Sequence, residues 1–118
     1  MSIKYSTGPL ENTGNNRSVD TVTHVLNNNR NKTVTAKIKV FALDGTKTII
    51  DEVTVKVPSR SNIFHTTTIP VNVITYEVQI KVHHEDDNTV LVGTFGRDAA
   101  FNQNPNHIVH REFTRIDV

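Results

Sequence analysis

Apolar and polar residues alternate along most of the chain from Ser18 onward. The clearest example is residues 33–43, in which the even positions from 34 to 42 are apolar and the odd positions up to 39 are threonine or lysine. Successive side chains of a β-strand point to opposite faces, so this alternation is typical of a strand with one buried face. The pattern therefore predicts a half-buried strand at 33–43.

Six further segments carry the strand pattern and are separated by polar turns. Asp44 and Gly45 follow the first strand with the residue types that a tight hairpin turn requires. No segment shows the 3.6-residue period of a helix. Regularly spaced strands predict an all-β fold, an antiparallel β-sandwich of jelly-roll or immunoglobulin-like type with about seven to eight strands. The further strands are expected at 18–26, 48–57, 62–69, 75–83, 89–95 and 107–116.

The inward faces of these strands predict the core, because one face of each alternating strand must leave water. Gly93 and Gly96, near the end of the strand at 89–95, indicate a β-bulge or a close approach of two backbones. A phosphate-binding loop is the less favoured interpretation of this glycine pair. The residues expected to be buried are Val34, Ile38, Val40, Val53, Val55, Tyr76, Val78, Ile80 and Val82.

The composition narrows the fold and the function further. Valine, isoleucine and threonine far outnumber leucine and alanine, as is typical of strands. The 118 residues suffice for one domain. The absence of cysteine excludes disulfides, thiolate metal sites and cysteine-based catalysis. The net charge is +1 with interspersed signs and no apolar run is long enough for a membrane span, so we expect neither nucleic-acid binding nor a membrane span.

Residues 1–17 differ in composition from the rest, and a single β-sandwich domain is expected at 18–118. Glycine, proline and asparagine favour turns over strand ladders, which predicts a flexible N-terminal arm. Two interpretations are open. The segment is either a terminus that is disordered or packs loosely on its own domain, or a connector that docks on a neighbour and is dispensable for folding. Its apolar anchors for such docking are Ile3, Tyr5 and Leu10.

The histidines offer little evidence for a metal site. The metal-like cluster of the chain is the segment 83–87, HHEDD, but neighbouring side chains of a strand point to opposite faces. We interpret it as a solvated hairpin turn. His107 and His110 also fall on opposite faces of the expected strand, and His24 and His65 are isolated in the sequence. No metal ligand is therefore predicted.

The chain contains none of the motifs expected of an enzyme. There is no Gly-x-Ser-x-Gly sequence, P-loop or dinucleotide-binding fingerprint, and the acidic residues fall in turns or on polar strand faces. Arg111 and Arg115 flank Phe113, but aromatic residues are too few to form a stacking platform for bases or sugars. The prediction is a protein without catalytic activity, cofactor or small-molecule substrate.

Several segments resemble known proteins. Residues 5–18, 76–78, 92–99 and 110–116 resemble a group of small, uncharacterised all-β proteins of endospore-forming Firmicutes. In length and in its N-terminal segment the chain is also similar in build to the endospore appendage (Ena-type) pilins. That resemblance implies a β-sandwich whose N-terminal connector inserts into the next subunit. The chain departs from those pilins in lacking the connector cysteines that cross-link their subunits.

The dimensions of the chain are compatible with such assembly. About 17 extended residues reach roughly 55 to 60 Å, whereas a domain of about 100 residues is roughly 33 Å across. The leading hypothesis is a structural subunit that self-assembles through its arm into a fibre, by adding a strand to a neighbour's sheet edge. The alternative is a monomeric binding module for a surface glycan or protein. We expect an extracellular or spore-surface location without a Sec signal peptide, and a cytoplasmic origin stays open.

Overall fold

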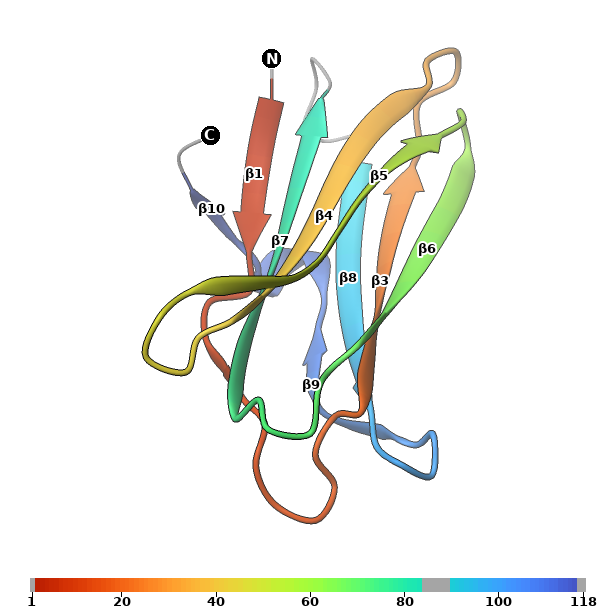
Figure 1. The fold of residues 1–118 in the computed structure, drawn as a ribbon. Helices are drawn as coiled ribbons and strands as arrows, with labels where there is room; N and C mark the ends of the chain where they lie inside the picture. The colour runs from red at the N-terminus through yellow and green to blue at the C-terminus, as the bar shows by residue number, and fades with distance from the viewer. Residues whose placement is uncertain (1, 84–89, 117–118) are drawn as a thin grey trace.

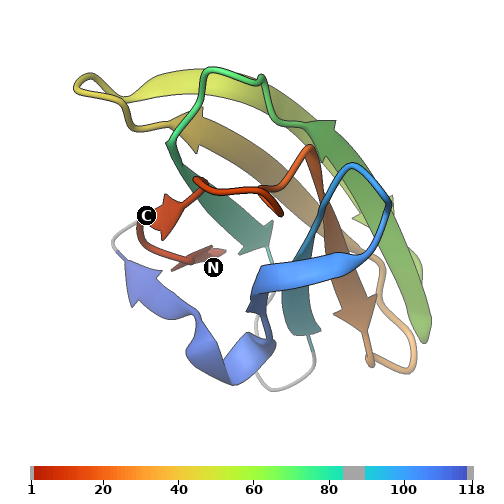
Figure 2. The same ribbon diagram turned by 90° about the horizontal axis from the view of Figure 1, so that it is seen from below.

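The chain folds into two antiparallel β-sheets that pack face to face, which confirms the predicted β-sandwich (Figure 1). The computed structural model describes residues 2–83 and 90–116. Sheet A has the strand order β10-β1-β7-β4-β5, with the short β2 also paired to β7, and sheet B has the order β6-β3-β8-β9. Figure 2 views the two layers from below. The elements are β1 (Ser2–Ser6), β2 (Leu10–Glu11), β3 (Asp20–Asn27), β4 (Val34–Ala42), β5 (Thr48–Val57), β6 (Ser61–Thr68), β7 (Thr75–His83), β8 (Val90–Arg97), β9 (Gln103–Ile108), the 3-10 turn η1 (His110–Glu112) and β10 (Thr114–Ile116).

The core lies between the two sheets and is close to the predicted one. Of the nine residues expected to be buried, seven are at most 2 % exposed. Val53 and Val55 are only partly buried, because β5 is an edge strand of sheet A and the core thins there. The turn after β4 also agrees with the prediction, since Gly45 has a φ of 83°. The alternation of the central strands thus identified both their faces and their bounds.

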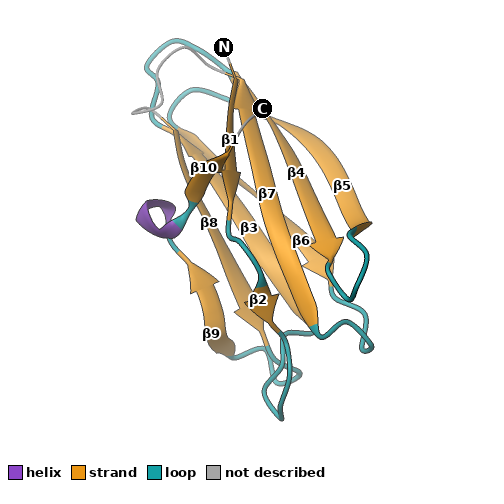
Figure 3. Cartoon of the chain, turned by 90° about the vertical axis from the view of Figure 1, so that its left-hand side faces the viewer, coloured by secondary structure: helices purple, strands orange, loops and turns teal. Residues whose placement is uncertain are grey.

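Residues 2–6 form an inner strand of sheet A, and the prediction of a flexible arm is wrong for them. β1 pairs with β10 on one side and with β7 on the other (Figure 3). Ile3 and Tyr5 are 4 % and 3 % exposed, and the Tyr5 ring packs edge-on against Phe113. Leu10 pairs with Tyr76 and packs against the core. The segment 2–17 therefore belongs to the same domain as the rest.

The physical reason for this difference is where the turn-forming residues fall. Gly8 and Gly14 have φ values of 69° and 94°, so they bend the chain between and after the two short strands. Asn12 is buried, and the backbone of Ser18 satisfies its side-chain amide. Nδ2 of Asn12 donates to the Ser18 carbonyl at 3.0 Å, and Oδ1 accepts from the Ser18 N–H at 2.6 Å. The glycine, proline and asparagine residues of the segment thus form its loops. Ile3 and Tyr5, at alternate positions, form a strand.

The C-terminal strand expected at 107–116 is broken in the structure. β9 ends at Ile108 in sheet B, η1 follows, and β10 then pairs with β1 in sheet A (Figure 3). The crossing buries Phe113, which is 9 % exposed. The aromatic ring between Arg111 and Arg115 is therefore a core group rather than an exposed platform.

Gly96 marks a close approach of chain segments, as the glycine pair predicts. The register of β8 with β9 shifts between Phe95 and Arg97. A Cβ atom at Gly96 would collide with the Ser18 hydroxyl and lie 2.6 Å from Oδ1 of Asn104. The amide of Asn104 in turn donates to the Ser18 hydroxyl at 2.7 Å. Gly96 thus makes room for a buried hydrogen bond that ties the N-terminal loop to sheet B.

Candidate functional site: a lysine face on sheet A

Three lysines stand in one row across the outer surface of sheet A. Lys4 of β1 lies directly opposite Lys81 of β7, and Lys81 lies directly opposite Lys37 of β4. Neighbouring strands are about 4.8 Å apart, so the row brings three positively charged side chains together. Like charges directly opposite each other destabilise a sheet. An anion bound over the row would remove that repulsion.

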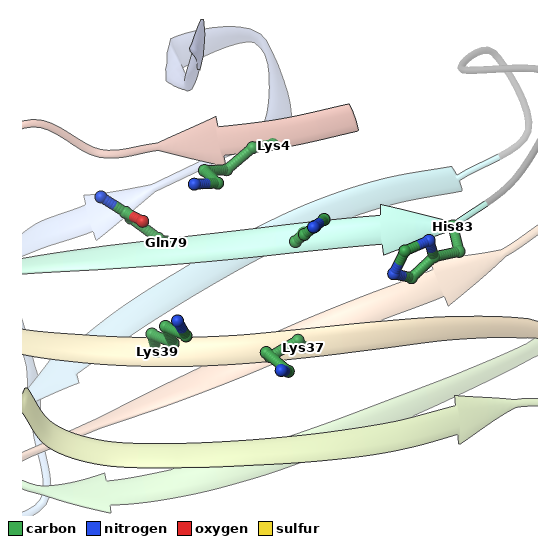
Figure 4. Close-up of a pocket in the computed structure, with 6 residues that line it drawn as sticks. Lys4, Lys37, Lys39, Gln79 and His83 are labelled. Carbon is green, nitrogen blue, oxygen red and sulfur yellow. The ribbon is translucent and has the colours of Figure 1, made fainter. Parts of the chain in front are cut away.

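The row lines a hollow of about 110 Å³. Lys39 and Gln79, which pair across β4 and β7, extend the lining on one side, and His83 completes it at the end of β7 (Figure 4). Nδ1 of His83 is hydrogen-bonded to the hydroxyl of Ser2, which links the ring to β1. We call this surface, formed by Lys4, Lys37, Lys39, Gln79, Lys81 and His83, the lysine face.

The positive charge of the lysine face is only partly neutralised. Glu52 of β5 lies 4.0 Å from Nζ of Lys37 and 3.9 Å from Nζ of Lys39, so one carboxylate serves two lysines. These ion pairs are solvent-exposed and therefore contribute little to the stability of the fold. Lys4 and Lys81 form no ion pair with any residue that the structure describes. Among the described residues, nothing neutralises the charge at the centre of the row.

Glu77 bounds the lysine face along β7. Its buried carboxylate accepts hydrogen bonds from Ser6 and Gln79 and lies 2.8 Å from Nζ of Lys47. Burial would raise the pKa of Glu77, but the bonds from Lys47, Ser6 and Gln79 outweigh burial and lower the pKa below its ordinary value of 4.5. The charge of Glu77 is thus matched by Lys47 and does not neutralise the row.

The side chains that line the lysine face supply hydrogen-bond donors and positive charge. Ammonium groups and the Gln79 amide donate hydrogen bonds, and none of the six described lining residues carries a hydroxyl, thiol or carboxylate. The lysine face thus concentrates positive charge in a hollow, an arrangement that favours the binding of an anion.

The residues predicted as an assembly site lie elsewhere. Ile3, Tyr5 and Leu10 point into the core of their own domain. Residues 84–87 of the HHEDD segment fall outside the described residues, whereas His83 belongs to the lysine face. In the described part of the chain, no three or more His, Asp or Glu side chains gather where a metal ion could bind.

Two histidines that are isolated in the sequence have partners in the structure. Nε2 of His65 lies 2.7 Å from Oδ2 of Asp51, which also accepts a hydrogen bond from Thr67. Burial would raise the pKa of Asp51, but its bonds to His65 and Thr67 outweigh burial and lower the pKa. This group connects β5 and β6 at the corner between the sheets. His24 stacks against Phe64 on the outer surface of sheet B.

The lysine face could not be predicted from the sequence, because it depends on the order of the strands in the sheet. Lys37, Lys39 and Lys81 were already on the outward faces of their predicted strands. The alternation does not reveal that β7 lies between β4 and β1. Lys4 lies in the segment 1–17, for which the sequence predicts a flexible arm rather than a strand of its own domain. The available indication was the presence of lysine at outward positions of two predicted strands, 33–43 and 75–83.

Comparison with known proteins identifies no family for the chain. No family model and no curated protein matches it. Among solved structures, the crystal structure of Thermotoga maritima 1070 is similar, with a TM-score of 0.46 and 11% sequence identity over 96% of this chain and 90% of that chain. No helix of the described residues has the length and apolar character to cross a membrane. The resemblance to the proteins of endospore formers stays a prediction.

Proposed function

We propose that this protein is a non-catalytic binding module that holds an acidic polysaccharide on its lysine face. The observation that carries this proposal is the row of Lys4, Lys81 and Lys37, three like charges in direct register, two of which have no acidic partner among the described residues. Such a row costs stability in the free protein and becomes favourable when carboxylate or sulfate groups neutralise it.

The lining favours an acidic glycan over a nucleic acid. Its described residues include no phenylalanine, tyrosine or tryptophan on which a base could stack and no arginine for bidentate phosphate recognition, and its one ring is the His83 imidazole at the edge. Lysines act as point charges that accept carboxylates and sulfates in many orientations. The Gln79 side chain, held by its bond to Glu77, adds an amide that can bond a sugar hydroxyl.

The overall charge of +1 does not conflict with this proposal. Charged side chains of both signs are spread along the sequence, but the sheet gathers lysines from three strands on one surface. Local potential, rather than net charge, steers an anionic ligand to a hollow. Binding should accordingly weaken as salt concentration rises.

The self-assembly hypothesis loses the segment on which it rested. It required a free arm whose apolar side chains seek a groove in a neighbour. Ile3 and Tyr5 are buried within their own domain. We therefore favour the binding-module hypothesis, and the acidic glycan makes its ligand specific.

The test is a binding titration with a neutral polysaccharide, its sulfated form and other anionic polymers. Dextran, dextran sulfate and polygalacturonate are compared on the full chain, together with a single-stranded oligonucleotide. We expect binding to one or both acidic polymers, no binding to dextran, and a loss of about tenfold or more in affinity for Lys81→Gln. Lys56→Gln removes the same charge from the exposed end of β5, outside the hollow, and is the matched control. Tighter binding of the oligonucleotide, or equal loss in both variants, would refute the proposal.

A further inference from the structure

The outer surface of sheet B is apolar where a solvated sheet face would be polar. Val22, Leu26, Phe64, Leu91 and Phe95 occupy outward positions of β3, β6 and β8, and Phe64 is 62 % exposed. Antiparallel sheets that face water normally alternate apolar-in with polar-out, so this surface departs from the rule. A contiguous apolar patch on a protein surface marks an interaction site.

The charged groups at this surface neutralise each other. Asp20 and Arg97, at one end of β3 and β8, form a two-pronged ion pair at 2.8 and 2.7 Å. The remaining outward positions of β3 and β6 are apolar, histidine, asparagine or threonine. The described residues of this surface therefore give no net charge that would repel the same surface of a second copy. The lysine face on the other sheet, in contrast, would repel a second lysine face.

One row of this surface contains both a projection and a hollow. Phe64 of β6 pairs with His24 of β3, and His24 pairs with Gly93 of β8. Phe64 projects into solvent at one end of the row. At the other end, a hollow of about 340 Å³ lies over Gly93, bordered by His24, Leu91 and Phe95. The Phe95 ring lies beside Gly93, 3.2 Å from where a Cβ atom of residue 93 would stand, and forms one wall of the hollow.

We infer that this protein forms a symmetric dimer through the outer surface of sheet B, with Phe64 of each copy seated in the hollow over Gly93 of the other. A two-fold axis that lies in the interface, parallel to β3 and above His24, places β6 of one copy over β8 of the other. Because Phe64 and Gly93 flank His24 in the same row, that axis places each Phe64 over the partner's Gly93. The surface is thus self-complementary, as a two-fold interface requires.

The available area fits a dimer of modest affinity. Four strands about 4.8 Å apart and about eight residues long, at about 3.3 Å per residue, form a face of roughly 500 Å². Two copies together therefore bury roughly 1,000 Å², which is close to the lower limit for a specific interface. The dimer would carry its two lysine faces on opposite outer sides, where they could engage two stretches of an acidic polymer. The inference itself does not rest on that function.

The test is sedimentation equilibrium of the full chain over a wide range of protein concentration. We expect reversible dimerisation by wild-type protein and a shift to monomer in Phe64→Ser, with the dimer dissociation constant raised tenfold or more. Phe101→Ser is the matched control, since Phe101 is 69 % exposed but lies in the β8–β9 loop away from the row, and it should still dimerise.

A second variant keeps the result decisive. Leu91→Lys places a charge at the border of the hollow on a side chain that is already 38 % exposed, so it should fold and remain monomeric. Circular dichroism verifies that each variant is folded. A wild-type protein that stays monomeric at millimolar concentration overturns the inference. A dimer that survives both Phe64→Ser and Leu91→Lys also overturns it, because the contact must then lie on another surface.

Discussion

Ile3 of β1 lies directly opposite Val82 of β7, and both side chains are buried in the core. This pair makes the N-terminal segment a structural part of the sandwich. β7 is central in sheet A because β1 covers one of its edges and β4 the other. Without β1, that edge of β7 would present unpaired backbone groups beside apolar side chains, which is the condition for aggregation.

Replacing Ile3 with alanine should therefore destabilise the protein. The loss of buried methyl groups and the cavity left behind should lower the free energy of unfolding by about 2 to 5 kcal/mol. Ile49→Ala is a matched control, because Ile49 is 55 % exposed on the edge strand β5 and its loss should cost less than about 0.5 kcal/mol. Urea denaturation measures both. If Ile3→Ala unfolds at the same midpoint as Ile49→Ala, β1 does not pack as described.

Gly96→Ala should also destabilise the fold, although alanine has the better strand conformation. The new methyl group would collide with the Ser18 hydroxyl and with the amide of Asn104, which hydrogen-bond each other. Overpacking of this kind costs about 1 to 3 kcal/mol. Thermal unfolding measures the change. A melting temperature equal to that of wild type would show that the N-terminal loop does not approach β8 so closely.

Glu77 should make the stability of the protein depend on acid. Burial raises its pKa, but hydrogen bonds from Lys47, Ser6 and Gln79 outweigh burial, so the folded-state pKa lies below the ordinary 4.5. A group with a lowered folded-state pKa stabilises the fold fully above its unfolded pKa and loses that contribution as pH falls through the folded value. Wild type should therefore lose more stability than Glu77→Gln between pH 6 and about pH 3.

Denaturant unfolding at several pH values tests this prediction. Asp51, whose pKa is also lowered, remains in the Glu77→Gln variant, so a reduced acid sensitivity is expected rather than none. Parallel stability curves for the two proteins over that pH range would contradict the assigned role of Glu77.

The sequence predicts the strands wherever one face is buried and the other is solvated. β5 and β7 have their predicted bounds, and the inward faces of β4 and β7 are buried as expected. The N-terminal strand was missed because it has only five residues and a turn-forming segment follows it directly. The break after Ile108 was missed because the pattern within 107–116 does not reveal that the chain changes sheets there.

Neither surface that we propose as functional follows from the alternation alone. The lysine face depends on β1, β7 and β4 being neighbours in that order, and the alternation specifies faces but not neighbours. The hollow over Gly93 likewise requires β3 to lie between β6 and β8. A glycine within a strand indicates a close approach, but only the pairing with His24 and Phe64 shows what lies beside it.

The measurement that tests the central claim most directly is thermal unfolding of wild type, Lys81→Gln and Lys56→Gln, each with and without polygalacturonate and dextran sulfate. Lys81 is opposed by Lys4 and Lys37, and each like-charge pair costs about 0.2 to 1 kcal/mol. Without ligand, Lys81→Gln should therefore melt higher than wild type, by about 2 to 8 °C for about 1 kcal/mol. An acidic polymer should raise the melting temperature of wild type and Lys56→Gln, because a ligand of the folded state stabilises it, and should have little effect on Lys81→Gln. A Lys81→Gln protein that melts no higher than wild type and responds equally to the polymers would contradict the claim that this row of lysines is an anion-binding site.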